Sequence, residues 1–339
     1  MDRNKALLKY CFTRLALAPI MLWLISSLVF LLLRVAPGDP VDAILGNRAD
    51  ASAREALRAK LGLNAPLINQ YFIFLNGLLH GNLGDSLNNQ ESVSHLIAKT
   101  LPASLELGIT ALIISSLIGI AVGLTGIAKP EGKTDLAGRL FGIGTYALPP
   151  FWAAMLIQLL FSVVLGWMPV AGRFPPGLSP PQGTGFLIWD SIWNRDFIAL
   201  QGTLNHLLLP AGTLGLLLSG VFSRSIRINL EKILATNHIE AARSRGIKEP
   251  QIIIKHALPN ALLPVLTIAG LTIASLIGGA LLIEVTFSWP GIALSLQEAI
   301  SQRDYPVVQG IVVVISSLVV IVSVVVDLLI AFIDPRIKY

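Results

Sequence analysis

Six long apolar stretches recur along this chain of 339 residues, and they limit what it can fold into. They cover residues 15–33, 103–127, 140–165, 204–222, 261–283 and 307–332. An α-helix rises 1.5 Å per residue, so about 20 apolar residues suffice to cross the hydrocarbon core of a bilayer. Only 13% of the residues are charged, against roughly 25% in soluble domains. The sequence therefore predicts an all-α membrane protein, a bundle of six transmembrane helices.

Positive charges are spread unevenly over the segments that join these stretches. Short cytoplasmic loops carry an excess of Lys and Arg, whereas long loops cross the membrane largely regardless of charge. If the N-terminus is cytoplasmic, the inner segments hold Arg3, Lys5, Lys9, Arg14, Lys129, Lys133, Arg139, Arg224, Arg227, Lys232, Arg243, Arg245, Lys248, Lys255, Arg336 and Lys338. Both termini are therefore predicted to be cytoplasmic. The basic residues behind the net charge of +5 lie between the apolar stretches and form no continuous stripe, which argues against a nucleic-acid partner.

The spans divide the chain into three parts. Residues 1–36 form an N-terminal cytoplasmic segment and the first transmembrane helix, whose apolar run exceeds the 7–15 residues of a signal peptide. Residues 37–100 are too polar to span and form an extracytoplasmic segment, which either receives a soluble partner or plugs the outer mouth. Residues 101–339 form a core with five transmembrane helices and a cytoplasmic loop at 223–260.

Small residues and prolines predict how the spans pack. Gly119 and Gly123 are four residues apart, and Gly270, Ala274 and Gly278 repeat that spacing, which lets helix backbones approach closely. The adjacent prolines 149 and 150 should kink the third span, because proline removes a backbone donor and clashes with the preceding turn. The kink either lines a pathway or is a packing bend, and we favour the bend.

Sequence signals for catalysis are absent. Cys11 is the only cysteine, and the five histidines lack metal-ligand spacing, so no metal site is predicted. Gly132-Lys133-Thr134 resembles the end of a phosphate-binding loop, but Ile127 occupies the position of its first glycine. No H-E-x-x-H or G-x-S-x-G motif appears. The chain is predicted not to be an enzyme, and any ATP hydrolysis would lie on another chain.

The loop between the fourth and fifth spans is the most informative segment. Asn237 can cap a helix, Glu240 can close a capping box, and Gly246 can end the helix in a left-handed conformation. The resulting helix of about eight residues is too short to be stable alone, so it needs packing. It is either a docking surface for another protein or an ordinary surface helix. The candidate docking residues are Asn237, Glu240, Ala241, Ala242, Arg243, Arg245 and Gly246.

Two acidic residues near or within spans are candidates for a pathway or gate, together with Pro149 and Pro150. Asp327 lies inside the sixth span, where a charge is costly and must face protein or water. It serves either a relay or an interhelical hydrogen bond, and we favour the latter. Glu284, at the end of the fifth span, either contacts cationic groups of a solute at the outer mouth or is an interfacial carboxylate without such a contact.

Glu240-Ala241-Ala242, Gly246 and Leu258-Pro259 resemble the EAA motif of ABC importer permeases, with His256 where isoleucine is usual. The chain is similar in particular to the dipeptide, oligopeptide and nickel permease branch. Fragments similar to that branch are Arg14-Leu15, Pro37-Gly38-Asp39-Pro40, Leu61-Gly62-Leu63, Gln70-Tyr71, Gly81-Asn82-Leu83-Gly84, Ser86-Leu87, Thr100-Leu101-Pro102, Leu105-Glu106-Leu107-Gly108, Ser288-Trp289-Pro290-Gly291, Arg303-Asp304-Tyr305-Pro306 and Asp334-Pro335-Arg336.

This resemblance implies a type I ABC importer permease in the bacterial plasma (inner) membrane. It implies that the EAA loop is a coupling helix seated in a groove of a cytoplasmic ATPase. The implied partners are a second homologous permease, two ATPase subunits and an extracytoplasmic substrate-binding protein. No cofactor is expected on this chain, because ATP and Mg²⁺ would be bound by the ATPases.

The implied substrates are di- and oligopeptides, with nickel or glutathione as alternatives. A secondary transporter remains a competing hypothesis. It would predict internal repeats and several charges near the bilayer midplane, of which the sequence offers only Asp327.

Overall fold

The computed structural model describes residues 3–35, 41, 45, 50–60, 62–125, 127 and 132–333. Over these residues the chain is helical, without a β-strand. The long helices are α1 (Arg3–Val35), α5 (Val93–Leu124), α9 (Phe197–Leu234), α12 (Leu258–Thr286) and α14 (Tyr305–Ile333). The shorter helices are α3 (Ala51–Lys60), α4 (Leu67–Leu79), α6 (Lys133–Ala147), α7 (Pro150–Gln158), α8 (Leu187–Trp193), α10 (Asn237–Ser244), α11 (Glu249–Gln251), α13 (Ile292–Ser301) and the π-helices η1 (Leu159–Val164) and η2 (Ile252–Ala257).

Within the described residues, four helices are long and apolar enough to cross a membrane, namely α1, α5, α9 and α14. They contain the first, fourth and sixth predicted spans, and α5 contains the second as far as Leu124. The fifth predicted span lies within α12, whose 29 residues extend about 43 Å at 1.5 Å per residue. α9 continues to Leu234, well past the expected end at residue 222, so much of the expected loop 223–260 is helical.

The third predicted span is not one kinked helix. The chain bends by 102° between α6 and the segment Pro150–Val164, which comprises α7 and η1. Pro149 occupies the N-cap of α7 and Pro150 its first turn, where a missing backbone N–H costs nothing. The prolines therefore start a new helix instead of bending an existing one. The position of the break at Pro149 and Pro150 was predicted correctly. The size of the bend was not, because a kink within one helix was expected and two separate helices are found.

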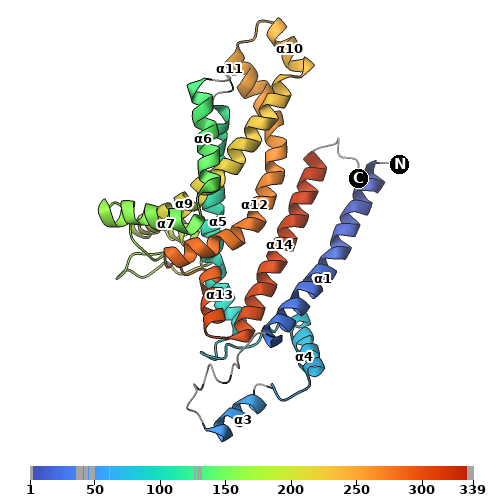
Figure 1. Ribbon diagram of the computed structural model, residues 1–339, viewed down its shortest axis with the longest axis vertical. Helices are drawn as coiled ribbons and strands as arrows, with labels where there is room; N and C mark the ends of the chain where they lie inside the picture. The colour runs from blue at the N-terminus through green and yellow to red at the C-terminus, as the bar shows by residue number, and fades with distance from the viewer. Residues whose placement is uncertain are drawn as a thin grey trace.

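α9 is the central helix of the bundle (Figure 1). It packs against α5, α6 and α12, and 67% of its apolar window is buried, against 11% for α1 and 6% for α14. The approach of α5 depends on the predicted glycines. A Cβ at Gly119 would lie 2.4 Å from Cβ of Phe222, and one at Gly123 would lie 3.0 Å from Cβ of Ile226. The prediction of close packing at these two positions is confirmed.

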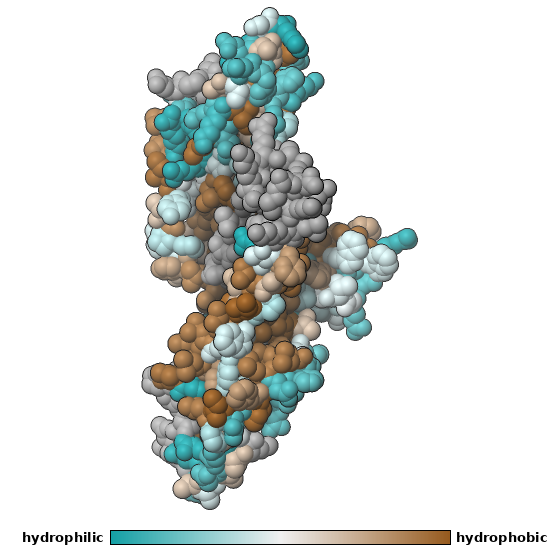
Figure 2. All heavy atoms as spheres, turned by 90° about the vertical axis from the view of Figure 1, so that its right-hand side faces the viewer, coloured by the Kyte–Doolittle hydropathy of each residue, from teal (hydrophilic) through white to brown (hydrophobic). Residues whose placement is uncertain are grey.

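α1 and α14 pack together at the periphery, and α14 also packs against α12 (Figure 1). A Cβ at Gly270 would lie 2.4 Å from a methyl of Val326 on α14, so this glycine also permits close approach. The side chain of Ala274 and the surroundings of Gly278 are not described. Where Figure 2 shows residues in colour, hydrophobic ones gather over the middle and lower part of this face, and hydrophilic ones gather at the two ends.

The two ends of the molecule differ. The start of α1 and the end of α14 lie towards the end that carries α10, whereas α3, α4 and α13 lie towards the other end (Figure 1). α4 packs on α1, where Phe30 meets Tyr71 at 5.4 Å between ring centroids. The Nε of Arg34 donates a hydrogen bond of 2.9 Å to Oε1 of Gln70. The fragment Pro37-Gly38-Asp39-Pro40 and residues 334–339 lie outside the described residues.

Candidate functional site

α10 begins one residue earlier than the sequence indicated. Its N-cap is Thr236, whose carbonyl accepts hydrogen bonds from the backbone N–H groups of Ile239 and Glu240 at 3.0 and 3.2 Å. Asn237 is therefore the first helical residue, and Glu240 comes one position too late to close a capping box. The N-cap assignment to Asn237 was wrong, because the extended backbone of Thr236 (ψ 151°) marks the entry to the helix. The predicted length of eight residues is confirmed.

The end of α10 was predicted correctly. Gly246 has φ +75°, the left-handed conformation that favours glycine. Its N–H bonds the carbonyl of Arg243 at 2.9 Å, and the N–H of Ile247 bonds that of Ala242 at 3.3 Å. These two bonds form a Schellman motif, which satisfies the last carbonyls of the helix.

Burial orients α10 with one face in the bundle and the other in solvent. Ile239 is fully buried in a cluster with Leu230 and Ile252, and Ala242 is half-buried against the same cluster. Ala241 is exposed. The two alanines therefore have different environments, and only one of them offers a low surface to a partner. The exposed residues of the helix and its end are Asn237, His238, Glu240, Ala241, Arg243, Ser244, Arg245 and Gly246.

Arg243 is engaged within the loop. Its Nη2 lies 2.6 Å from Oε1 of Glu249, and its Nε donates to Oε2 at 3.1 Å, a bidentate pair. The hydrogen bond from Arg243 lowers the pKa of Glu249, and the same bond raises the pKa of Arg243. Within the described part of the chain Arg245 has no ion-pair partner. Arg245 is thus the more available cation for an external contact.

η2 joins this loop to α12. The N–H of Leu258 bonds the carbonyl of Ile253, five residues back, and Pro259 follows with no N–H to donate. His256, the departure from the EAA pattern, is exposed within this π-helix. Such π-turns are rare and occur frequently at functional sites.

Glu284 is a structural carboxylate in this conformation. It is fully buried, accepts a hydrogen bond from the hydroxyl of Ser104, and accepts the backbone N–H of Leu294 at 2.9 Å. Leu294 lies in the first turn of α13, whose positive dipole end favours an anion. A Cβ at Gly291 would lie 2.4 Å from this carboxylate, which explains the glycine. The carboxylate of Glu284 is enclosed by these partners in this conformation, and a contact with cationic groups of a solute stays a prediction.

Asp327 and the two prolines have simpler environments. Oδ2 of Asp327 lies 3.2 Å from Nε of Arg14 on α1, an interhelical ion pair, but this oxygen has no hydrogen-bond partner within the described residues. The favoured expectation of an interhelical hydrogen bond therefore stays a prediction. Pro149 and Pro150 are exposed at the turn between α6 and α7. The structure does not bring these three residues together with Glu284 or with α10.

The sequence reasoning missed a buried ion pair at the end of the bundle opposite α10. Glu106 on α5 accepts hydrogen bonds from Nη2 and Nε of Arg173, and their side chains are 4% and 10% exposed. Glu106 also accepts the backbone N–H of Ile188 at 2.8 Å, in the first turn of α8. The signal was present, since an ionisable residue within an apolar stretch needs a partner. The partner could not be identified, because Arg173 lies in an irregular segment.

Fragments that are far apart in the sequence meet at the same end. The Nε1 of Trp289 donates to the carbonyl of Ala103 at 3.0 Å, and this indole is fully buried. Asp304 accepts hydrogen bonds from the hydroxyl of Ser86 at 2.6 Å and from the backbone N–H of Leu87 at 3.2 Å. Several of the sequence fragments that resemble the permease branch therefore contact one another in the structure.

The sequence matches two models of one protein family. Residues 100–339 match the model described as "Binding-protein-dependent transport system inner membrane component", and residues 7–108 match a model for the N-terminal part of such components. The chain belongs to this family. It is a multi-pass permease of the bacterial plasma membrane.

Curated relatives of the permease cover nearly its full length. The Di/tripeptide transport system permease protein DppB of Pseudomonas aeruginosa is 36% identical over 316 residues, covering 93% of this chain and 94% of the relative. The Dipeptide transport system permease protein DppB of Alkalihalophilus pseudofirmus is 36% identical over 333 residues, covering 98% and 100%. The Escherichia coli K12 protein of that name is 36% identical over 321 residues, covering 93% and 94%.

A solved structure shares the fold of the permease. An inward-facing form of the MetNI methionine ABC transporter superposes with a TM-score of 0.54 at 17% identity, covering 70% of this chain and 96% of the matched chain. At that identity the likeness shows the fold alone. It agrees with the sequence-based expectation of an ABC permease fold.

Proposed function

We propose that this permease is a membrane subunit of an ATP-driven, binding-protein-dependent importer of di- and oligopeptides. The curated relatives named for dipeptide or di/tripeptide transport support the substrate, because they match over at least 93% of this chain. The family description supports an extracytoplasmic binding protein. The resemblance of Glu240-Ala241-Ala242 and Gly246 to the EAA motif supports ATPase subunits as partners. ATP hydrolysis is assigned to those partners and not to this chain.

The membrane topology that we propose has six spans and both termini in the cytoplasm. α1, α5, α9, α12 and α14 are five of the spans, and the bent pair α6 and α7 is the remaining one. The distribution of Lys and Arg supports this orientation. The shared end of α10, the start of α1 and the end of α14 is consistent with it (Figure 1).

The observation that carries the proposal is the geometry of α10. Ile239 anchors the helix to the bundle and the Schellman motif fixes its end, while Glu240, Ala241 and Arg245 remain exposed. A short helix held in this way transmits a push from a docked protein to α9 on one side and to η2 and α12 on the other. We propose that a cytoplasmic ATPase supplies that push, with a second permease completing the pathway.

The test places a large charged side chain on the exposed part of α10. Ala241→Arg should abolish copurification of the ATPase and uptake of a labelled dipeptide, because the new side chain blocks close contact. Insertion of the permease into the membrane should be unchanged, since residue 241 touches no buried cluster.

The matched control is Ala171→Arg, an exposed alanine at a distant point of the chain. It should leave ATPase copurification at the wild-type level. Full copurification and uptake with Ala241→Arg would overturn the assignment of α10. Uptake of nickel or glutathione by the wild-type complex, with no uptake of dipeptide, would overturn the substrate.

A further inference from the structure

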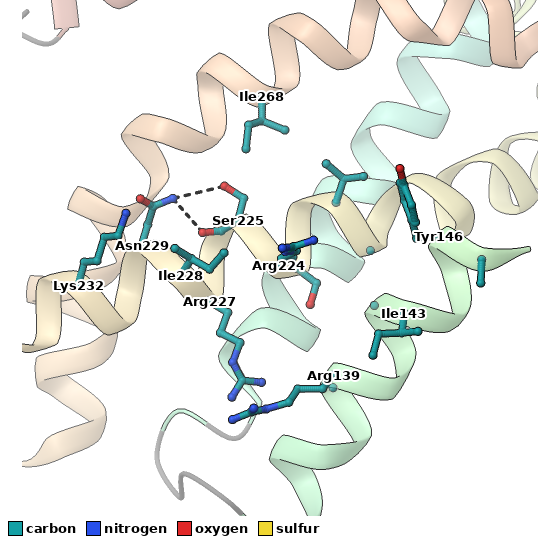
Figure 3. Close-up of a pocket in the computed structure, with 16 residues that line it drawn as sticks. Arg139, Ile143, Tyr146, Arg224, Ser225, Arg227, Ile228, Asn229, Lys232 and Ile268 are labelled. Carbon is teal, nitrogen blue, oxygen red and sulfur yellow. Dashed lines mark hydrogen bonds between the residues drawn. The ribbon is translucent and has the colours of Figure 1, made fainter.

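A groove of about 910 Å³ lies between α6, α9 and α12, on the part of α9 that leads into α10. Figure 3 shows it with the side chains that line it. Four of these are cationic, namely Arg139 from α6 and Arg224, Arg227 and Lys232 from α9, whereas no acidic side chain lines the groove among the described residues. The sequence reasoning assigned these residues only to the count of cytoplasmic charges.

The four cations differ in how they are neutralised. Arg139 and Arg227 share the buried carboxylate of Asp135, and Arg227 also pairs with Glu231 at 3.1 Å. These charges balance one another and tie α6 to α9. Arg224 and Lys232 are exposed and have no ion pair in the described ranges. They are eight residues apart on one helix, about 12 Å at 1.5 Å per residue, and they leave the groove electropositive.

The remaining lining groups suit a small amphipathic molecule. Ile143 and Tyr146 of α6, Ile228 of α9 and Ile268 of α12 supply apolar and aromatic surface (Figure 3). The Nδ2 of Asn229 donates to the carbonyl of Ser225 at 2.8 Å, which fixes the amide and presents its Oδ1 as an acceptor. Sites for small ligands have volumes of about 300–1,000 Å³ and combine apolar walls with a few placed polar groups. A di- or tripeptide fits within this volume and suits the chemistry of the lining.

We propose that this groove binds the C-terminal carboxylate of a peptide in transit, with Arg224 and Lys232 as its cationic partners. The proposal rests on the peptide function proposed above. A permease that moves many peptides cannot rely on their side chains, because these vary. The C-terminal carboxylate and the backbone amides are the same in every peptide. The groove offers two cations for the carboxylate and the Oδ1 of Asn229 as an acceptor for a backbone N–H. Charge-assisted hydrogen bonds are about twice as strong as neutral ones, which suits this role.

The position of the groove on α9 would couple peptide binding to the movement of α10 that the ATPase drives. Lys232 lies within the last turn of α9, and α10 begins three residues after that helix ends. A displacement of α10 therefore moves Lys232 relative to Tyr146 and Ile143 on α6. The groove can thus change its affinity for the carboxylate as the ATPases close and open.

The experiment measures uptake by the complete importer in proteoliposomes, at saturating peptide-loaded binding protein. The double variant Arg224→Gln, Lys232→Gln should lower the uptake of a labelled dipeptide about tenfold, the effect expected from losing one charged hydrogen bond. The charge-conserving swap Arg224→Lys, Lys232→Arg should retain most of the uptake. Lys99→Gln removes an exposed cation of α5 outside the groove and serves as the matched control.

Three outcomes would overturn the proposal. The first is uptake by the double Gln variant equal to that of Lys99→Gln. The second is loss of assembly in the charge-conserving swap, which would make the groove a structural interface. The third is a wild-type rate that falls when phosphatidylglycerol is left out of phosphatidylcholine vesicles, with the double variant insensitive to that change, which would assign the cations to an anionic lipid headgroup. If the wild-type complex took up no peptide at all, the proposed function itself would fail, and that result is visible without any variant.

Discussion

Three buried carboxylates accept backbone N–H groups from other segments of the chain. Glu106 binds the first turn of α8, Glu284 binds the first turn of α13, and Asp304 binds the backbone at Leu87. Backbone N–H groups at helix starts have no partner within their own helix, and an unsatisfied one costs several kcal/mol in the bilayer. A carboxylate supplied by another helix satisfies them and fixes where the segment docks. Glu106 and Glu284 therefore act as tertiary caps, whereas Asp304 holds the turn that contains Leu87.

Glu106→Gln tests this role. The substitution leaves the guanidinium of Arg173 buried without its counterion, so we expect a loss of about 3–5 kcal/mol of stability. The measurement is the thermal unfolding midpoint of the purified permease, followed by tryptophan fluorescence. Glu298→Gln, an exposed acid on α13, is the matched control and should change little.

The double variant Glu106→Gln, Arg173→Met separates the ion pair from general damage. It removes both charges, and replacing a buried pair by apolar groups is often neutral. Most of the lost stability should return. If Glu106→Gln were as stable as the Glu298→Gln control, the ion pair would not stabilise the docking of the segment that carries Arg173.

At the scale of elements, irregular geometry is concentrated where helices connect. The chain bends by 102° at the two prolines that follow α6, and η2 inserts a π-turn just before Pro259. Missing N–H groups explain both, because the chain must either start a new helix or shift its hydrogen bonds past the proline. α10 differs, since it ends at a glycine in a conformation that other residues rarely adopt.

Gly246→Ala tests whether that ending matters for coupling. A Cβ at this position would meet no atom within 4 Å, so the only cost is conformational, about 1–2 kcal/mol. We expect the end of α10 to fray and peptide-stimulated ATPase activity to fall. Gly246→Asn should be milder, because asparagine enters the left-handed region more readily. Equal activity of the alanine, asparagine and wild-type forms would show that the Schellman end is not needed.

At the scale of the whole molecule, α9 is the buried axis and α1 and α14 form a peripheral pair. Arg14 and Asp327 connect this pair by one ion pair, and α14 reaches the core through the close approach at Gly270. The contacts between distant fragments gather at the end away from α10, and the exposed short helix lies at the other end. This polarity agrees with an outer end that is tied together and an inner end that receives a partner.

Labelling single cysteines tests the orientation. Cys11 is the only cysteine, so Cys11→Ser gives a background without thiols. Asn89→Cys, in an exposed turn near α13, should react with an impermeant maleimide added to intact cells. Ser244→Cys, exposed at the end of α10, should react only after the cells are opened. Labelling of Ser244→Cys in intact cells would reverse the proposed topology.

The sequence by itself determined the helical membrane class, the places of the long apolar helices α1, α5, α9 and α14, the eight-residue helix and its glycine ending. Each of these depends on local signals, namely runs of apolar residues or the conformational freedom of one residue. The tertiary structure decided the pairing of Glu106 with Arg173, the burial of Glu284, the inward face of Ala242 and the groove beside Arg224 and Lys232. These features depend on which helices meet and at what angle. The 102° bend after α6 is an example, because the direction of α7 decides which residues it packs against and no local sequence signal gives that direction.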